Sequence, residues 1–71
     1  MIMTDEMRFF IFLIENYAYD KQLSTADVLR TWEEKGVVQK IYDMYEMYHI
    51  EAIENAYADI DNLVKTGKHL W

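Results

Sequence analysis

The chain has 71 residues and no cysteine, so it forms one domain at most, and neither disulfide bonds nor thiolate metal sites can stabilise it. Its net charge of −6, from 13 acidic and 7 basic residues, offers no basic face to a phosphate backbone and argues against direct binding to nucleic acid. The longest uninterrupted apolar run, residues 9–14, falls well short of the ~20 residues of a membrane span, so we expect a cytoplasmic protein that does not enter the membrane.

Stability is a constraint at this size. A chain this short buries only about 60% of the surface that its unfolded form exposes, so a lone monomer would be marginal. Hydrophobic residues make up 52% of the sequence and aromatic residues 15%. Two sources of stability therefore remain: a densely packed apolar core, or burial of apolar surface against another subunit.

The first predicted helix spans about residues 4–20. Thr4 is placed to cap the free N–H groups, and the two acidic residues after it suit the positive end of the helix dipole. Apolar residues recur at helical spacing and widen beyond one face, at Met7, Phe9, Phe10, Phe12, Leu13, Ile14, Tyr17 and Ala18. A helix that is apolar over most of its circumference is buried on more than one side, which in so small a domain favours contact with another chain.

The second predicted helix spans about residues 24–35. Ser24 is typical of an N-cap, and Asp27 occupies the reciprocal position of a capping box. Gly36 predicts the end of the helix, because glycine adopts the left-handed conformation there without steric cost. The inner face of this helix consists of Val28, Leu29 and Trp32.

The third segment, about residues 37–66, contains neither proline nor glycine. Its apolar residues follow the helical period at Val38, Ile41, Tyr45, Tyr48, Ala52, Ala56, Ile60 and Leu63. Alone, this pattern predicts one helix of about 29 residues ending at Gly67, roughly 43 Å long against about 25 Å for the first helix. Such a helix would extend beyond its neighbours unless it packs on a second molecule or breaks, and we place the break near residues 49–51.

These elements predict an all-α fold and a single domain over residues 1–71. The architecture is a small bundle of three helices, and a break in the third would create a fourth. The predicted core consists of Phe10, Leu13, Ile14, Tyr17, Val28, Leu29, Trp32, Ile41, Tyr45, Ile60 and Leu63.

Residues that could carry chemistry are few, and we expect neither a cofactor nor catalysis. Glu46 and His49 form a Glu-x-x-His pair, a spacing that supplies ligands in di-iron helical bundles, but such sites need a second pair and two further glutamates. The motif occurs once, and a half-buried histidine that hydrogen-bonds a neighbour is the simpler interpretation. Asp59 and Asp61 lie about 200° apart around a helix, on either side of Ile60, which predicts a solvated pair rather than a shared site.

Tyrosine and methionine side chains crowd residues 42–48. Both types are enriched at protein interfaces, and with the first helix they form more large apolar surface than three short helices can hide. Trp71 folds back on the core, stays disordered, or serves as an aromatic anchor in a partner's pocket. The candidates for partner binding are therefore Phe9, Phe12, Tyr42, Met44, Met47, Tyr48 and Trp71.

Four segments are distinctive when taken together: residues 9–18 (FFIFLIENYA), 23–29 (LSTADVL), 41–49 (IYDMYEMYH) and 55–61 (NAYADID). They resemble a family of short bacterial all-helical proteins classed only as a domain of unknown function, and the resemblance covers nearly the whole chain. Members often place Thr, Ser or Gly after the histidine, where this sequence has Ile50, a poor cap. Their genes often lie beside genes for ADP-ribosyltransferase-like toxins, which implies an antitoxin-like or accessory role. The resemblance implies no catalytic or binding residue.

The leading hypothesis is a non-catalytic protein-binding module that self-associates, binds the product of a neighbouring gene, or does both. The alternative is a small metal-binding protein or enzyme that uses Glu46 and His49. A third hypothesis, an acidic mimic of nucleic acid, ranks last because the carboxylates are spread over all the predicted helices instead of one face.

Overall fold

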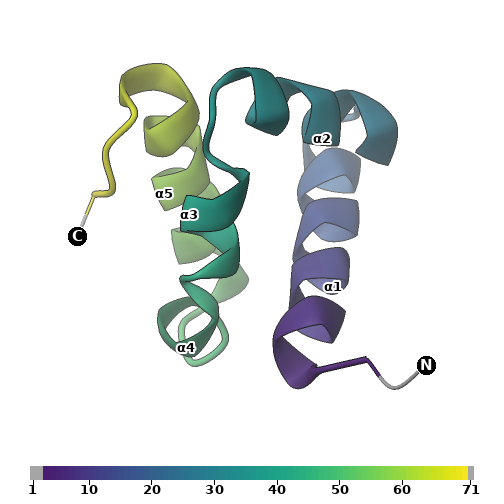
Figure 1. Ribbon diagram of the computed structural model, residues 1–71, viewed down its shortest axis with the longest axis vertical. Coiled ribbons are helices and arrows are strands. Elements are labelled where there is room, and N and C mark those ends of the chain that lie inside the picture. The colour runs from purple at the N-terminus through teal and green to yellow at the C-terminus, as the bar shows by residue number, and fades with distance from the viewer. Residues whose placement is uncertain (1–2, 71) are drawn as a thin grey trace.

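The computed structural model describes residues 3–70. This part of the chain is all-helical and contains no strand, as predicted, but it has five helices instead of three or four. They are α1 (Asp5–Asp20), α2 (Thr25–Glu34), α3 (Val38–Tyr42), α4 (Tyr45–Tyr48) and α5 (Ile53–Thr66). In Figure 1, α2 crosses the end of α1, α3 and α4 lead away from it, and α5 turns back beside them.

The first two helices begin where capping residues predict. The Thr4 side chain accepts a hydrogen bond from the Met7 backbone N–H at 3.1 Å, and Ser24 accepts one from the Asp27 N–H at the same distance. Both caps satisfy backbone donors that have no partner within the helix. After α2 the chain turns at Gly36, whose φ of 68° lies in the left-handed region, as the sequence predicted.

The third predicted segment is not one helix. It forms α3, α4 and α5, separated near Asp43 and again between His49 and Ala52. The second break falls where we placed it, and Ala52 is extended there, with φ −61° and ψ 139°. The first break was not predicted, because no proline or glycine marks it. There the Met44 N–H bonds to the Ile41 carbonyl at 3.1 Å, a one-turn contact that ends α3.

The break after α4 lets α5 return alongside α3 and α4. A continuous helix over residues 37–66 would have carried the apolar face of α5 beyond the end of the 16-residue α1. At its far end α5 stops at Gly67, whose φ is 79° and whose N–H bonds to the Leu63 carbonyl at 2.7 Å. Glycine is suited to this left-handed position because a side chain there would be strained.

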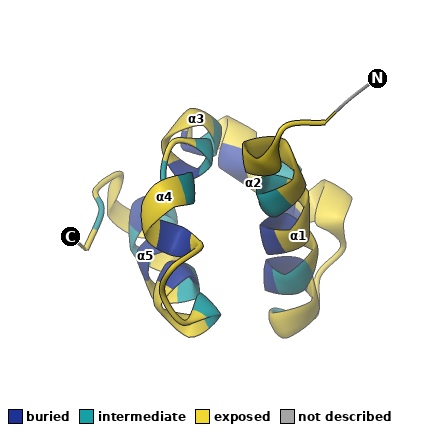
Figure 2. Ribbon diagram, turned by 90° about the horizontal axis from the view of Figure 1, so that it is seen from below, coloured by how far each residue is buried: buried dark blue, intermediate teal, exposed yellow. Residues whose placement is uncertain are grey.

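The core lies between α1 and α2 on one side and α3, α4 and α5 on the other (Figure 2). Trp32 is its largest member, and its ring lies 5.5 Å from the Tyr17 ring and 5.9 Å from the Phe10 ring. Most predicted core residues are buried, although Phe10, Leu29 and Tyr45 are only half-buried. The buried residues that the sequence did not single out as core are Ala18, Val37, Tyr48, Ala56 and Asp59.

Within residues 3–70, no helix is long and apolar enough to cross a membrane.

The start of α5 carries no side-chain cap, because Ala52 occupies the N-cap position. We expect Ala52→Ser to raise the free energy of unfolding by about 0.5–1 kcal/mol, since its hydroxyl can accept from a free N–H of the first turn. The matched control, Ser24→Ala, should lower the free energy of unfolding by about 1 kcal/mol. Urea unfolding followed by circular dichroism measures both, and an Ala52→Ser variant less stable than wild type would contradict the assigned start of α5.

Candidate functional site

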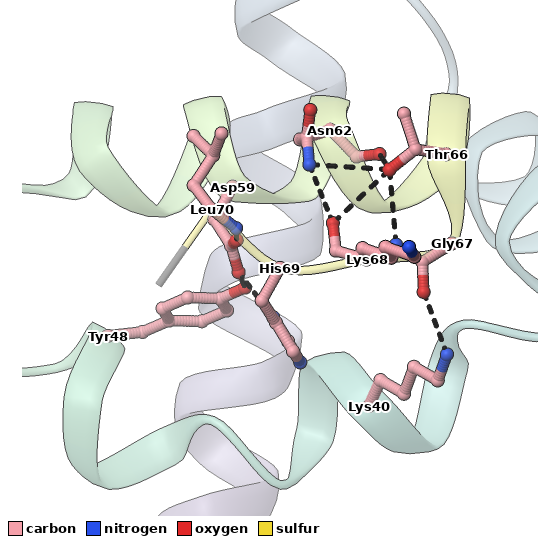
Figure 3. A network of polar contacts seen from close by, with 9 residues as sticks. All are labelled: Lys40, Tyr48, Asp59, Asn62, Thr66, Gly67, Lys68, His69 and Leu70. Carbon is pink, nitrogen blue, oxygen red and sulfur yellow. Dashed lines mark hydrogen bonds and ion pairs between the residues drawn. The ribbon is translucent and has the colours of Figure 1, made fainter.

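Asp59 of α5 is the one fully buried charged residue among residues 3–70. Its carboxylate accepts hydrogen bonds from three donors (Figure 3). The Tyr48 hydroxyl of α4 and the His69 ring nitrogen Nδ1, at 2.7 Å, share Oδ2, and the Leu70 backbone N–H reaches Oδ1 at 2.5 Å. Our expectation that Asp59 is solvated is therefore wrong. It is buried because residues distant in the sequence cover it, which helical spacing does not reveal.

The electrostatics favour an ionised carboxylate with a neutral tyrosine. Burial on its own would raise the pKa of Asp59, but the hydrogen bonds from Tyr48, His69 and Leu70 outweigh that effect and hold the pKa below its ordinary value. Burial and the same hydrogen bond raise the pKa of Tyr48, so its proton stays on the hydroxyl. We call this arrangement the Asp59 clamp: one carboxylate accepts hydrogen bonds from Tyr48, His69 and Leu70 and holds the three donors together.

The clamp fastens the C-terminal segment, residues 67–70, to the rest of the fold (Figure 3). The Lys40 Nζ of α3 donates to the Gly67 carbonyl at 2.9 Å, and the Asn62 side-chain amide donates to the Lys68 carbonyl at 2.7 Å. The Lys68 N–H in turn donates to the Thr66 hydroxyl at 3.1 Å. With the two donors to Asp59, these contacts join the segment to α3 and α5.

Asp61 forms a second, more exposed clamp on the other side of Ile60. Its Oδ1 accepts from the Tyr17 hydroxyl at 2.5 Å, and its Oδ2 pairs with Lys21 Nζ at 2.8 Å. Burial, reinforced by Asp61, raises the pKa of Tyr17, and the hydrogen bond to Asp61 raises the pKa of Lys21. The two aspartates thus lie on opposite sides of α5, as predicted. Asp59 holds α4 and the C-terminal segment, and Asp61 holds the C-terminal end of α1.

Glu46 and His49 both lie at the surface, on or beside α4. The His49 ring stacks on the Tyr45 ring at 4.3 Å, and its Nδ1 lies 2.6 Å from the Tyr45 carbonyl oxygen. Glu46 lines an open depression of about 380 Å³ together with Glu6, Tyr42, Asp43, Tyr45 and Met47. Within residues 3–70, no three His, Cys, Asp or Glu side chains are grouped so that they could hold one metal ion.

The partner-binding candidates occupy different environments. Phe12 and Met47 are exposed, at 52% and 42%, whereas Phe9, Tyr42 and Met44 are half-buried. Phe9 packs against Tyr45, with their ring centroids 5.6 Å apart. Tyr48 belongs to the core, because it is only 1% exposed and its hydroxyl bonds to Asp59, so it offers no surface to a partner. Trp71 lies outside the described residues.

Exposed apolar side chains also lie along α1. Ile11, Phe12 and Tyr19 are 37%, 52% and 86% exposed, on the side of the helix opposite the buried Leu13 and Tyr17. The sequence pattern indicated that α1 is apolar beyond one face, but neither Ile11 nor Tyr19 was among the candidates. A helical projection would have found them. We define the α1 outer face as Arg8, Ile11, Phe12, Glu15 and Tyr19, all of which are exposed.

A family model described as "Protein of unknown function (DUF3791)" matches residues 8–67. The chain belongs to this family. The match contains the whole α1 outer face and both aspartates of the clamps on α5, and it ends before His69. Searches of curated proteins and of solved structures gave no match. Membership of DUF3791 therefore identifies the domain, and its task has to be inferred from the residues.

The Asp59 clamp predicts a strong and specific dependence on charge. In Asp59→Asn, the amide N–H₂ must face one of the three donors, so we expect the free energy of unfolding to fall by about 3 kcal/mol. Asp61→Asn is the matched control: its side chain is 46% exposed and an amide oxygen can still accept from Tyr17, so the loss should stay below about 1 kcal/mol. Urea unfolding at neutral pH measures both, and equal losses would contradict the clamp.

The same clamp predicts the direction of a pH effect. The pKa of Asp59 is lower in the folded state than its ordinary value of 3.8, so its contribution to stability is complete above that value and is lost as the pH falls through the folded pKa. The difference in unfolding free energy between wild type and Asp59→Asn should therefore shrink as the pH falls below 3.8. A difference that does not change over the acid range would show that the carboxylate is not held in its ionised form.

Proposed function

We propose that this DUF3791 domain is a non-catalytic protein-binding module whose contact surface is the α1 outer face. The observation that carries the proposal is the exposure of Ile11, Phe12 and Tyr19 on one side of a helix whose opposite side already contributes four residues to a complete core. More than a third of the surface of each of these residues stays exposed, although the Phe12 ring also contacts the Phe9 ring, with their centroids 6.2 Å apart. Large exposed apolar side chains gathered on one face are characteristic of a contact surface.

Burial of these side chains against a partner contributes substantial binding free energy. Full burial of a phenylalanine or isoleucine side chain is worth about 1.5–3 kcal/mol relative to exposure, and aromatic side chains dominate the binding energy of many interfaces. Phe12 is the natural anchor because it lies near the middle of α1 and is 52% exposed. Arg8 and Glu15 flank it and supply the charged rim typical of an interface.

The placement of the reactive groups supports a non-catalytic role. Perturbed pKa values occur chiefly at Tyr17, Tyr48 and Asp59. Each of these side chains is hydrogen-bonded to another residue of the protein and holds two of its segments together. The two tyrosines retain their protons more firmly than usual, which is opposite to what a general base or nucleophile needs. Among hetero-partners, the net charge of −6 favours one with a basic rim, and the product of an adjacent gene is the first to test.

The test compares Phe12→Glu with Ile50→Glu. Both replace an exposed apolar residue by a carboxylate, but Ile50, which is 72% exposed, lies in the turn after α4, outside the α1 outer face. Tagged full-length wild type and variants are expressed in the native host, and bound proteins, including untagged copies of the chain, are quantified by mass spectrometry. We expect Phe12→Glu to reduce the recovered partner by about tenfold or more and Ile50→Glu to leave it unchanged.

Thermal unfolding separates loss of binding from loss of folding, because both variants should melt close to wild type, as is usual for exposed substitutions. If the three proteins recover the same partner equally, the α1 outer face is not the contact surface. If wild type recovers neither another protein nor copies of itself, the binding role itself is wrong.

A further inference from the structure

Within the α1 outer face, Arg8, Ile11, Phe12 and Glu15 place opposite charges at the two ends of an apolar pair. Arg8 lies three residues before Ile11, and Glu15 lies three residues after Phe12, so the pattern is symmetric about the midpoint between Ile11 and Phe12. At 1.5 Å per residue, the two charged positions are about 10.5 Å apart along the axis. Both side chains are exposed, and neither belongs to the three ion pairs of residues 3–70.

We propose that the α1 outer face docks on the same face of a second copy of this chain, antiparallel, about a twofold axis that passes between Ile11 and Phe12. This inference rests on the proposed function and specifies its partner. A twofold interface brings residue i against j and j against i, so the surface must complement itself. In this register Arg8 faces Glu15 of the second copy, and Ile11 faces Phe12 of the second copy, and each pairing occurs twice.

The charge pattern selects the antiparallel direction. If the two α1 outer faces packed in parallel, Arg8 would face Arg8 of the second copy, and Glu15 would face Glu15 of the second copy. Both pairs would repel. The antiparallel pair converts both repulsions into attractions and also opposes the two helix dipoles. Arg8 is the only basic residue between Asp5 and Asp20, so the acidic copies meet at the one place where α1 offers a positive charge.

The spacing also suits the packing of two helices. Residues 8, 11, 12 and 15 follow the i, i+3, i+4, i+7 pattern that lines one side of a helix and fits against a neighbour about 8–10 Å away, the usual interaxial distance. Tyr19 extends the α1 outer face and lies level with Thr4 of the second copy, because the two positions are equally far from the twofold axis. One pair of short helices makes a small interface, so we expect weak, concentration-dependent association.

Charge reversal tests the register directly. Arg8→Glu puts a carboxylate opposite Glu15 of the second copy, and Glu15→Arg puts a guanidinium opposite its Arg8, so each variant should repel its own copies. In an equimolar mixture of the two variants, the acidic positions 8 and 15 of one variant face the basic positions 15 and 8 of the other. In the double variant R8E/E15R, position 8 is acidic and position 15 is basic, so opposite charges face each other between identical copies. Glu34→Arg on α2 carries the same charge change as Glu15→Arg, away from the α1 outer face, and serves as the control.

Sedimentation equilibrium of the full chain measures the association, and circular dichroism confirms that every variant is folded. We expect each single variant to associate about tenfold or more weakly than wild type, and the mixture, the double variant and the Glu34→Arg control to associate like wild type. Recovery in the mixture distinguishes this pairing from general electrostatic repulsion, because only facing positions of unlike copies can restore it.

Three results would overturn the proposal: a wild type that stays monomeric at high concentration, single variants that associate as well as wild type, or a mixture that does not recover. Suppose that Phe12→Glu nevertheless fails to recover another protein that wild type captures from the host. The α1 outer face then binds that protein instead of a second copy, so the proposed function stands and the twofold pairing fails. If Phe12→Glu recovers the same proteins as wild type, the proposed function and the twofold pairing both fail.

Discussion

A carboxylate can remain ionised in the interior of a small protein only when hydrogen-bond donors surround it, because removing an unpaired charge from water costs several kcal/mol or more. Asp59 meets this condition with donors from two segments, α4 and the C-terminal residues 69–70. None of these donors is its neighbour in the sequence. The requirement therefore fixes where α4 and the C-terminal segment lie relative to α5, and much of the arrangement on that side of the molecule depends on it.

The break in the third predicted segment and the Asp59 clamp are two aspects of one constraint. In a continuous helix, Tyr48 and Asp59 would lie about 16.5 Å apart along the axis, far beyond the reach of a hydroxyl and a carboxylate. Their hydrogen bond requires the chain to reverse direction between them, and it does so between His49 and Ala52. Asp61 then closes the opposite side by bonding Tyr17 and Lys21 at the end of α1. One side of α5 thus holds α4 and the C-terminal segment, and the opposite side holds the end of α1.

Local signals in the sequence were sufficient for the features that depend on nearby residues. Thr4, Ser24, Gly36 and Gly67 marked helix ends correctly because caps and left-handed turns act within a few residues. Apolar periodicity identified most of the core for a similar reason, since it records which side of each helix turns inward. The break near Asp43 has no such local marker, and it lies between Ile41 and Tyr48, which both reach the core.

The candidate site was less predictable, because exposure depends on what covers each side chain. Phe9 and Phe12 are the same residue type on the same helix, yet Phe9 packs against α4 while Phe12 faces outward. Tyr48 resembled its neighbours in the tyrosine-rich segment and proved to be the buried donor to Asp59. Asp59 itself could not be recognised, since its three hydrogen bonds join it to residues ten or more positions away.

If the polar clamps complete the fold and the α1 outer face is its contact surface, only that face should respond to the presence of other copies. Two-dimensional NMR spectra of the wild-type chain over a wide range of concentration test this claim most directly. We expect shifts that grow with concentration and are confined to Arg8, Ile11, Phe12, Glu15 and Tyr19, while the amide of Leu70 stays constant. Shifts centred on α4 or the C-terminal segment, or a spectrum independent of concentration, would contradict the claim.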